Sequence, residues 1–203
     1  SNEEVAAAFA GGKKIVSFPD VLNELTAKTD NIVVAGSYGK STCTALLAWC
    51  LMQTGKDPNY FVGEITKGFA AHAHKGGGSV FVLEGDEYPS ANWDATPKFL
   101  RYNAHSILLT SATHDHVNVY PTHEDYLAPF EKLISRLPAD GLLVVNGSEP
   151  HVRALAAKFR GKKVLYAVPD GWHAKNIACG TPSTFDLMRG GKKIITLSTL
   201  LLG

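Results

Sequence analysis

Apolar residues in this chain gather in short, nearly continuous runs, which are separated by longer stretches with helical spacing. The runs show little alternation between apolar and polar positions, as is typical of strands that are buried on both faces. They predict strands over residues 32–35, 59–62, 79–84, 105–110, 141–146 and 163–167, with a further short strand at 13–16. The stretches between them predict helices over residues 18–27, 40–54, 123–137 and 150–159, and a short helix within 94–102. Such alternation indicates an α/β fold, with a mostly parallel sheet covered by helices on both faces.

The pattern changes after Gly171, where short runs are separated by Gly, Pro and Arg-Gly-Gly turns. These runs, at 172–179, 183–188 and 192–197, predict a small antiparallel annex near the C-terminus. Residues 1–12 are interpreted as a polar lead-in or linker with an alanine-rich turn, which leaves residues 13–203 as the folded domain. Residues 66–78 are rich in Gly, Ala and His and are expected to form a mobile excursion. The apolar run at the end of the chain indicates a fragment of a longer protein.

One predicted strand leads through a glycine loop into a helix. After residues 32–35 the chain continues as Gly36-Ser37-Tyr38-Gly39-Lys40-Ser41-Thr42. Glycines allow backbone N–H groups to converge, the helix N-terminus adds positive potential, and Lys40 adds a full charge. Such a loop cradles a polyphosphate, and Ser41 is placed to put its hydroxyl on a magnesium ion that also touches the phosphates. The common spacing of a phosphate-binding loop, or P-loop, has a glycine where this chain has Val34, so this loop is a shortened form and the sheet is expected to be of the P-loop type. The alternative is a glycine-rich turn with an unrelated lysine.

Two polar motifs follow other predicted strands. Ligands of parallel α/β sheets bind beyond the carboxyl ends of the strands, which is where both motifs are expected to lie. The motifs are Glu84-Gly85-Asp86-Glu87-Tyr88 and His114-Asp115-His116. Glu84 can give magnesium an oxygen ligand, and His116 can give a nitrogen ligand that would suit manganese as well. Taken alone, each motif has a plain alternative: a solvated acidic loop, or turn histidines bonded to the backbone. Beside a phosphate-binding loop, a metal site is favoured.

Composition and charge exclude several classes of protein. The 203 residues include 20 basic and 19 acidic side chains, so bulk charge does not indicate a nucleic acid or an anionic membrane as partner. The sequence has no apolar run long enough to span a bilayer and no signal peptide. The three cysteines form no pairing framework, and a cytoplasmic location is therefore expected.

The motifs G-S-Y-G-K-S-T, E-G-D-E-Y and D-H, in this order on a parallel sheet, resemble those of the central ATP-binding domain of the Mur ligases. These enzymes build the peptide of bacterial cell-wall precursors. The resemblance covers roughly residues 16–203. The long interval from Glu84 to His116, with Asp94, Lys98-Phe99 and Tyr102 inside it, is similar to one branch of the family. That branch joins UDP-N-acetylmuramate to a preformed L-alanyl-γ-D-glutamyl-meso-diaminopimelate tripeptide during cell-wall recycling.

The resemblance implies an ATP-dependent amide ligase. ATP would phosphorylate the muramate carboxylate to an acyl phosphate, which the amino group of a peptide or amino acid would attack. Carried onto this chain, the loop from Gly36 to Thr42 would hold ATP, with Lys40 on the β- and γ-phosphates. Ser41 and Glu84 would bind one Mg²⁺ or Mn²⁺, and Glu84 and His116 a second. The implied catalytic residues are Lys40, Glu84 and His116, and the implied metal ligands are Ser41, Glu84 and His116.

The chain also departs from the family pattern. Family members often carry Asp in place of Pro89, Asn in place of Ser111 and Asp in place of Asn118, which bears on the metal shell and the contacts to adenine. No lysine lies between His116 and Glu131, so the carbamylated lysine of several relatives is not expected. The N-terminal UDP-binding domain and the C-terminal domain are expected to lie outside this chain. The chain alone should therefore bind nucleotide weakly and ligate nothing.

Three alternatives stay open at this point. The first is a UDP-N-acetylmuramate–alanine ligase, which adds a single amino acid. The second is another Mur-like ligase of the folylpolyglutamate type, against which the 94–102 segment argues. The third is a non-catalytic nucleotide-binding module, which would have no need for both Glu84 and His116.

Overall fold

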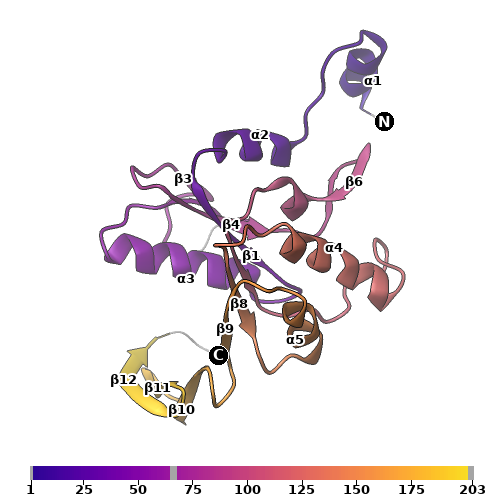
Figure 1. Cartoon of the computed structure of the whole chain (residues 1–203). Coiled ribbons are helices and arrows are strands. Elements are labelled where there is room, and N and C mark those ends of the chain that lie inside the picture. The colour runs from indigo at the N-terminus through magenta and orange to yellow at the C-terminus, as the bar shows by residue number, and fades with distance from the viewer. Residues whose placement is uncertain (1, 65–67, 201–203) are drawn as a thin grey trace.

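A ten-stranded sheet forms the centre of the molecule, and helices cover both of its faces (Figure 1). The structure is a computed structural model that describes residues 2–64 and 68–200. Five strands, all parallel to their neighbours, form the middle of the sheet: β9 (Lys162–Tyr166), β8 (Leu142–Asn146), β7 (Ser106–Leu109), β1 (Asp30–Ala35) and β4 (Val80–Gly85). Next to β4 comes β2 (Asn59–Phe61), also parallel, and then the antiparallel β3 (Ala73–His74). The predicted α/β class is confirmed.

The strand β1 is buried on both sides, as its unbroken apolar run predicted. Val34 packs with Ala48 of α3 (Lys40–Gln53) in the core on one face of the sheet. Val33 and Ala35 belong to the larger core on the other face, together with Phe130. This second core lies under α2 (Phe18–Leu25), α4 (His123–Ser135) and α5 (Pro150–Ala157). Alternate side chains of a strand point to opposite faces, so only a sheet covered on both sides buries all of them.

Two local predictions were wrong. The lead-in contains a helix, α1 (Glu3–Ala10), which Asn2 caps by accepting a hydrogen bond from the Val5 N–H at 3.1 Å. Residues 13–16 form no strand, and most of their side chains are exposed. The short helix predicted within 94–102 is present as the 3₁₀ helix η1 (Lys98–Arg101), whereas the strand before it, β6 (Asp94–Pro97), was not predicted. Pro97 disfavours a helical conformation at the residue before it, so β6 pairs instead with β5 (Pro89–Ala91).

The antiparallel annex is confirmed, and it continues the main sheet. It consists of β10 (Trp172–Ala178), β11 (Ser183–Arg189) and β12 (Lys192–Thr199). A parallel pairing of Trp172 with Tyr166 joins β10 to β9. Residues 66 and 67 of the predicted mobile excursion lie outside the described residues, and its later part contributes β3. The mobility of this segment stays a prediction.

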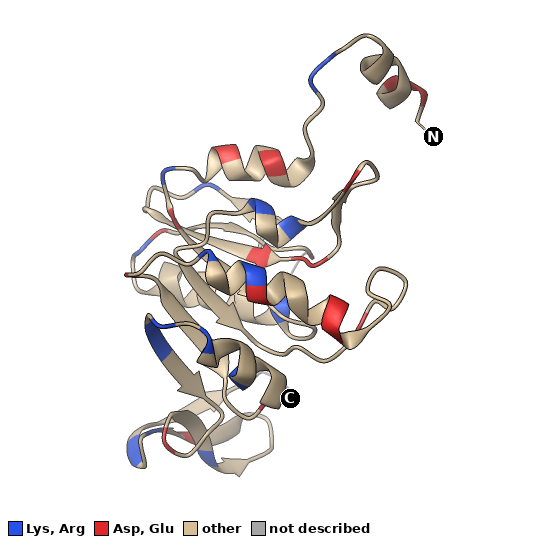
Figure 2. Ribbon diagram, turned by 45° about the vertical axis from the view of Figure 1, so that its right-hand side comes forward, with Lys and Arg blue, Asp and Glu red and all other residues tan. Residues whose placement is uncertain are grey.

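Both signs of charge are distributed over the molecule. Figure 2 shows Lys and Arg in the helices, in the sheet and in the annex, with Asp and Glu among them. Within the two described ranges, none of the helices is long and apolar enough to cross a membrane. The three cysteines, all in the described part of the chain, are free.

Candidate functional site

The glycine loop after β1 is pressed against the chain that follows β7. Gly36 has a φ of 136°, and a Cβ atom there would lie 2.3 Å from Thr110 Oγ1 and 2.8 Å from both the N and O atoms of Ser111. These distances are far below van der Waals contact, so the close approach requires glycine. Gly39 has a φ of 77° and is the N-cap residue of α3. Because glycine has no side chain, the first N–H groups of α3 are left for another acceptor.

Hydrogen bonds fix the loop in this position. Ser37 Oγ donates to Thr113 O at 2.6 Å, and the buried hydroxyl of Tyr126 donates to Ser37 Oγ at 2.9 Å. Burial raises the pKa of Tyr126, so its hydroxyl keeps its proton for this bond. Tyr38 N donates to Ser111 Oγ at 2.9 Å, although the Tyr38 side chain itself is exposed. Ser111 therefore supports the loop through its hydroxyl.

Ser41 and Glu84, which the sequence assigned to one metal ion, are in direct contact. Ser41 Oγ donates to Glu84 Oε1 at 2.9 Å, and Gly63 N donates to Glu84 Oε2 at 2.7 Å. Ser41 stands in the first turn of α3, and Glu84 is a buried residue near the end of β4, the neighbour of β1. The hydroxyl and the carboxylate thus reach each other from adjacent elements at the carboxyl edge of the sheet.

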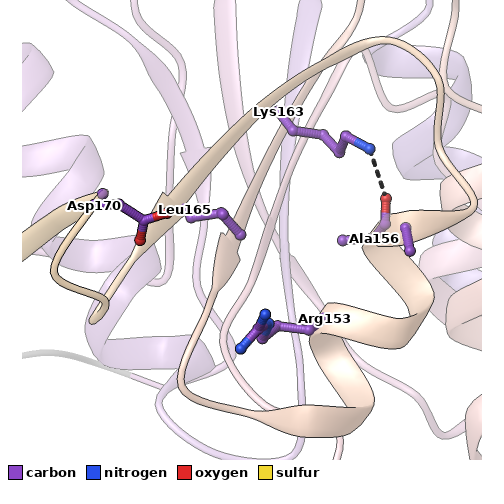
Figure 3. A pocket seen from close by; sticks show the side chains of 7 residues that line it. Arg153, Ala156, Lys163, Leu165 and Asp170 are labelled. Atoms are coloured by element: carbon purple, nitrogen blue, oxygen red, sulfur yellow. Dashed lines mark hydrogen bonds between the residues drawn. The ribbon is translucent and has the colours of Figure 1, made fainter. Parts of the chain in front are cut away.

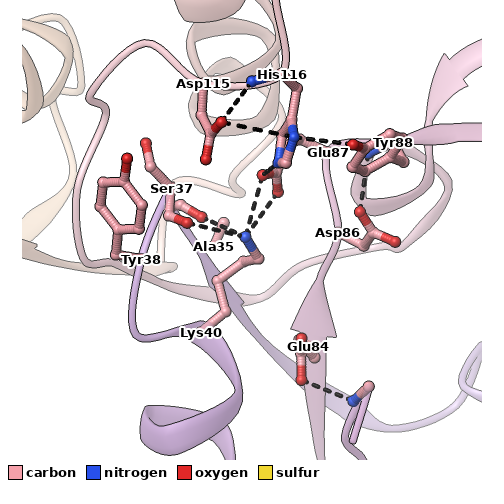
Figure 4. A network of polar contacts seen from close by, with 12 residues as sticks. Ala35, Ser37, Tyr38, Lys40, Glu84, Asp86, Glu87, Tyr88, Asp115 and His116 are labelled. Carbon is pink, nitrogen blue, oxygen red and sulfur yellow. Dashed lines mark hydrogen bonds and ion pairs between the residues drawn. The ribbon is translucent and has the colours of Figure 1, made fainter. Parts of the chain in front are cut away.

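A second cluster joins Lys40 to His116 through a residue that the sequence had not singled out, Glu87 (Figure 4). Lys40 Nζ lies 3.1 Å from Glu87 Oε1 and 3.0 Å from Oε2. His116 Nε2 lies 2.9 Å from Glu87 Oε1. Glu87 is 1% exposed, so its carboxylate is nearly removed from water between the two basic groups. Lys40 also donates to Gly36 O at 2.8 Å.

The surroundings of His116 hold its ring in place. Tyr88 Oη lies 2.9 Å from His116 Nδ1, on the side of the ring opposite Glu87. His116 has a φ of 54°, a left-handed conformation that is uncommon for a residue with a side chain. Its backbone N–H donates to Asp115 Oδ1 at 2.7 Å. Tyr120 donates to the backbone oxygen of Glu87, which fixes the loop after β4. Non-glycine residues in such conformations cluster at functional sites.

The structure therefore gathers the four principal predicted residues at one edge of the sheet, in two groups. Ser41 faces Glu84, whereas Lys40 and His116 face Glu87. The second metal ion that Glu84 and His116 were expected to share stays a prediction. Thr42 lies exposed in the first turn of α3. Among the residues that the structure describes, no group of three or more His, Cys, Asp and Glu side chains is arranged to hold a metal ion. Magnesium in nucleotide sites usually takes one or two protein carboxylates and completes its shell with phosphates and water.

Three further residues of the sequence analysis belong to neither pair of contacts. Pro89 starts β5 and pairs with Pro97 of β6. Asn118 lies exposed in the turn after His116. His114, the other histidine of its motif, makes a different contact, with Nε2 2.7 Å from Tyr120 O.

A separate hollow of about 370 Å³ lies between α5 and β9 (Figure 3). Its lining includes Arg153, Lys163 and Asp170, together with Ala156 and Leu165. Its lining includes no residue of the glycine loop and none of the residues Ser41, Glu84, Glu87 and His116. Lys163 Nζ already donates to Ala156 O at 3.2 Å. The polar clusters at the strand ends, rather than this hollow, are therefore the candidate site.

Known proteins are similar to this chain in sequence and in architecture. The UDP-N-acetylmuramate–L-alanine ligase of Hydrogenobaculum sp. is 29% identical over 204 residues, which cover 100% of this chain and 44% of that protein. The UDP-N-acetylmuramate–L-alanyl-γ-D-glutamyl-meso-2,6-diaminoheptandioate ligase of Haemophilus influenzae is 27% identical over 173 residues, or 85% of this chain and 38% of that protein. The chain thus spans less than half the length of these two relatives.

A solved structure is similar over nearly the whole chain. It is the UDP-N-acetylmuramate:L-alanyl-γ-D-glutamyl-meso-diaminopimelate ligase from Neisseria meningitides, with a TM-score of 0.90 and 26% identity. The match covers 98% of this chain and 64% of that one. The family model of the Mur ligase middle domain matches residues 34–203, a segment that includes the glycine loop, Glu84, Glu87 and His116. The chain therefore belongs to the Mur ligase family.

Proposed function

We propose that this chain is the nucleotide-binding central domain of an ATP-dependent amide ligase that activates UDP-N-acetylmuramate as an acyl phosphate. The observation that carries the proposal is the pair of contacts between one loop and one strand end. Lys40 and Ser41 are consecutive residues, and each meets a carboxylate, Glu87 and Glu84 respectively. A loop that offers a cation, a hydroxyl and free helix N–H groups fits a polyphosphate, while the carboxylates fit its metal ion.

The residues of the site have separate tasks in this proposal. Phosphoryl transfer needs positioning and the neutralisation of charge that develops on the transferred group. The Lys40 ammonium would neutralise the β- and γ-phosphates, and the N–H groups at the start of α3 would orient them. Glu87 and Tyr88 hold the ring of His116 from two sides, which keeps its position fixed while the muramate carboxylate approaches.

The donor set fits a magnesium ion, with Mn²⁺ as a second possible occupant. Ser41 Oγ and the Glu84 carboxylate are hard oxygen ligands already in contact. Within the described part of the chain, Glu87 Oε2 is buried and accepts no hydrogen bond, although it lies 3.0 Å from the Lys40 ammonium. An ion held by Ser41 and Glu84 would supply Lewis-acid stabilisation of the phosphates.

The relatives guide our proposal for the substrates. We propose the tripeptide L-alanyl-γ-D-glutamyl-meso-diaminopimelate as the amine substrate, because the structure of 0.90 TM-score is named as a ligase for that tripeptide. L-alanine is the second candidate, because the relative from Hydrogenobaculum is named as an alanine ligase. We also propose a cytoplasmic location, because three free cysteines fit a reducing compartment. The UDP-sugar and the amine would be gripped by domains outside residues 13–203.

Binding of ATP to the 203-residue chain tests the core of the proposal. Isothermal titration with ATP, in MgCl₂ and in EDTA, should show weak binding that magnesium strengthens. Ser41→Ala should reduce affinity in magnesium by about tenfold, because the ion loses a hydroxyl ligand. Ser135→Ala, which removes an exposed hydroxyl at the end of α4, is the matched control and should bind like the wild type. A wild-type chain that binds no ATP in either buffer would refute the proposal.

A ligation assay distinguishes the two amine substrates. A longer enzyme that contains this domain is incubated with ATP, UDP-N-acetylmuramate and either the tripeptide or L-alanine, and ADP release is measured. We expect release with the tripeptide, while release with L-alanine alone would assign the second candidate. The 203-residue chain under the same conditions should form no amide bond.

A further inference from the structure

The carboxylate of Glu87 contacts the Lys40 ammonium, the same group that would bind a phosphate at the glycine loop. It is 1% exposed, and it lies within 3.1 Å of the Lys40 ammonium through both of its oxygens. The Lys40 side chain is 15% exposed and also bonds to Gly36 O, so its ammonium is folded back onto its own loop. To reach a phosphate, Lys40 has to give up part of this ion pair (Figure 4).

When the Lys40 ammonium moves to a phosphate, the Glu87 carboxylate loses its cation. His116 Nε2 contacts only Oε1, and among the described residues Oε2 accepts no hydrogen bond. A buried carboxylate that loses its cation is strongly disfavoured, and the incoming phosphates add further negative charge beside it. A divalent cation that arrives with the nucleotide restores the balance of charge. An oxygen without a hydrogen bond is available to interact with that cation, directly or through its water shell.

We propose that Glu87 is a specificity-determining residue that makes nucleotide binding conditional on a divalent cation. Without nucleotide it neutralises Lys40. With nucleotide bound, the Glu87 carboxylate interacts with the metal ion instead of with Lys40, so the metal-bound triphosphate is preferred to the free anion. This inference rests on the proposed function, since it requires a nucleotide at the glycine loop.

The test compares ATP affinity in MgCl₂ and in EDTA for the wild-type chain and for Glu87→Gln. Glutamine has nearly the same shape but no charge, so it frees Lys40 and removes repulsion of the phosphates. In EDTA we expect Glu87→Gln to bind ATP about tenfold more tightly than the wild type. In MgCl₂ we expect Glu87→Gln to bind ATP no more tightly than the wild type. The magnesium preference, which is the ratio of ATP affinity in MgCl₂ to that in EDTA, therefore falls by at least about tenfold. Glu131→Gln, which neutralises an exposed carboxylate on α4, should leave both affinities unchanged.

Glu87→Asp separates charge from shape. It keeps the charge but shortens the side chain, so it should retain the magnesium preference within about threefold, whereas a purely structural role would be served better by Gln. Thermal melts establish that each variant is folded, and Glu87→Asp alone still decides the matter if Glu87→Gln does not fold. If Glu87→Gln weakens binding equally in both buffers, or Glu87→Asp loses the magnesium preference, this inference is wrong and the proposed function stands. If the wild type binds no ATP at all, both are wrong.

Discussion

Replacement of Gly36 by alanine tests the packing that holds the phosphate-binding loop. Two separate effects should destabilise the Gly36→Ala variant. The φ of 136° is a conformation that residues with a side chain rarely adopt, and holding alanine there costs roughly 1–3 kcal/mol. The new methyl group would also lie 2.8 Å from the backbone N and O of Ser111, atoms that no change of rotamer can move away.

The magnitude follows from these two terms. Overpacking of this kind typically costs about 1–3 kcal/mol, because the backbone has to shift by several tenths of an ångström. The two effects together predict a loss of roughly 2–6 kcal/mol in the free energy of unfolding. That is a large part of the roughly 5–15 kcal/mol that stabilises a typical domain. Any shift of the loop away from Ser111 would also move Lys40, so ATP affinity should fall as well.

Urea unfolding followed by circular dichroism measures the first effect, with linear extrapolation to water. Gly55→Ala is the matched control, because Gly55 has a φ of 72° but, among the described residues beyond its chain neighbours, no atom lies within 4 Å of the place that a new methyl group would take. It should lose only the conformational term, about 1–2 kcal/mol. If Gly36→Ala loses no more stability than Gly55→Ala, the close approach of the loop to Ser111 does not limit this position, and our reasoning is refuted.

Two further predictions concern charge. Lys40→Met should destabilise the nucleotide-free chain by about 1–3 kcal/mol, because the buried Glu87 carboxylate keeps only the His116 contact. The double variant Lys40→Met/Glu87→Gln should recover most of this loss in urea unfolding, and a single variant as stable as the wild type would contradict the prediction. Hydrogen bonds from the Ser17 hydroxyl, and to a lesser extent from the Ser17 backbone N–H, lower the pKa of Asp20 in the folded chain. The contribution of Asp20 to stability is therefore complete above its unfolded-state pKa of about 3.9. It is lost as the pH falls through the lower folded-state pKa. Thermal melts of Asp20→Asn should accordingly show less loss of Tm below about pH 4 than those of the wild type, and parallel curves would exclude this role.

The sequence determined the elements whose signals are local. An apolar run without alternation specifies a strand buried on both faces, and it predicted β1, β4, β7 and β8 to within a few residues. The order of strand, glycine loop and helix likewise placed Lys40 and Ser41 correctly at the start of α3. Residues 13–16 show the limit of this reasoning. Their composition suits a strand, but a strand exists only where a neighbour accepts its hydrogen bonds.

The tertiary structure alone decided that Glu87 meets Lys40 and His116. Glu84 and Glu87 are three residues apart in one motif, and local spacing does not indicate which of the two contacts Lys40. The end of β4 at Gly85 separates them: Glu84 lies in the strand and faces Ser41, while Glu87 lies beyond it and faces Lys40 and His116. Such pairing depends on the direction of the chain after a strand ends and on the packing of distant residues such as Tyr120. Local spacing contains no record of either, because both are set by contacts between segments far apart in the sequence.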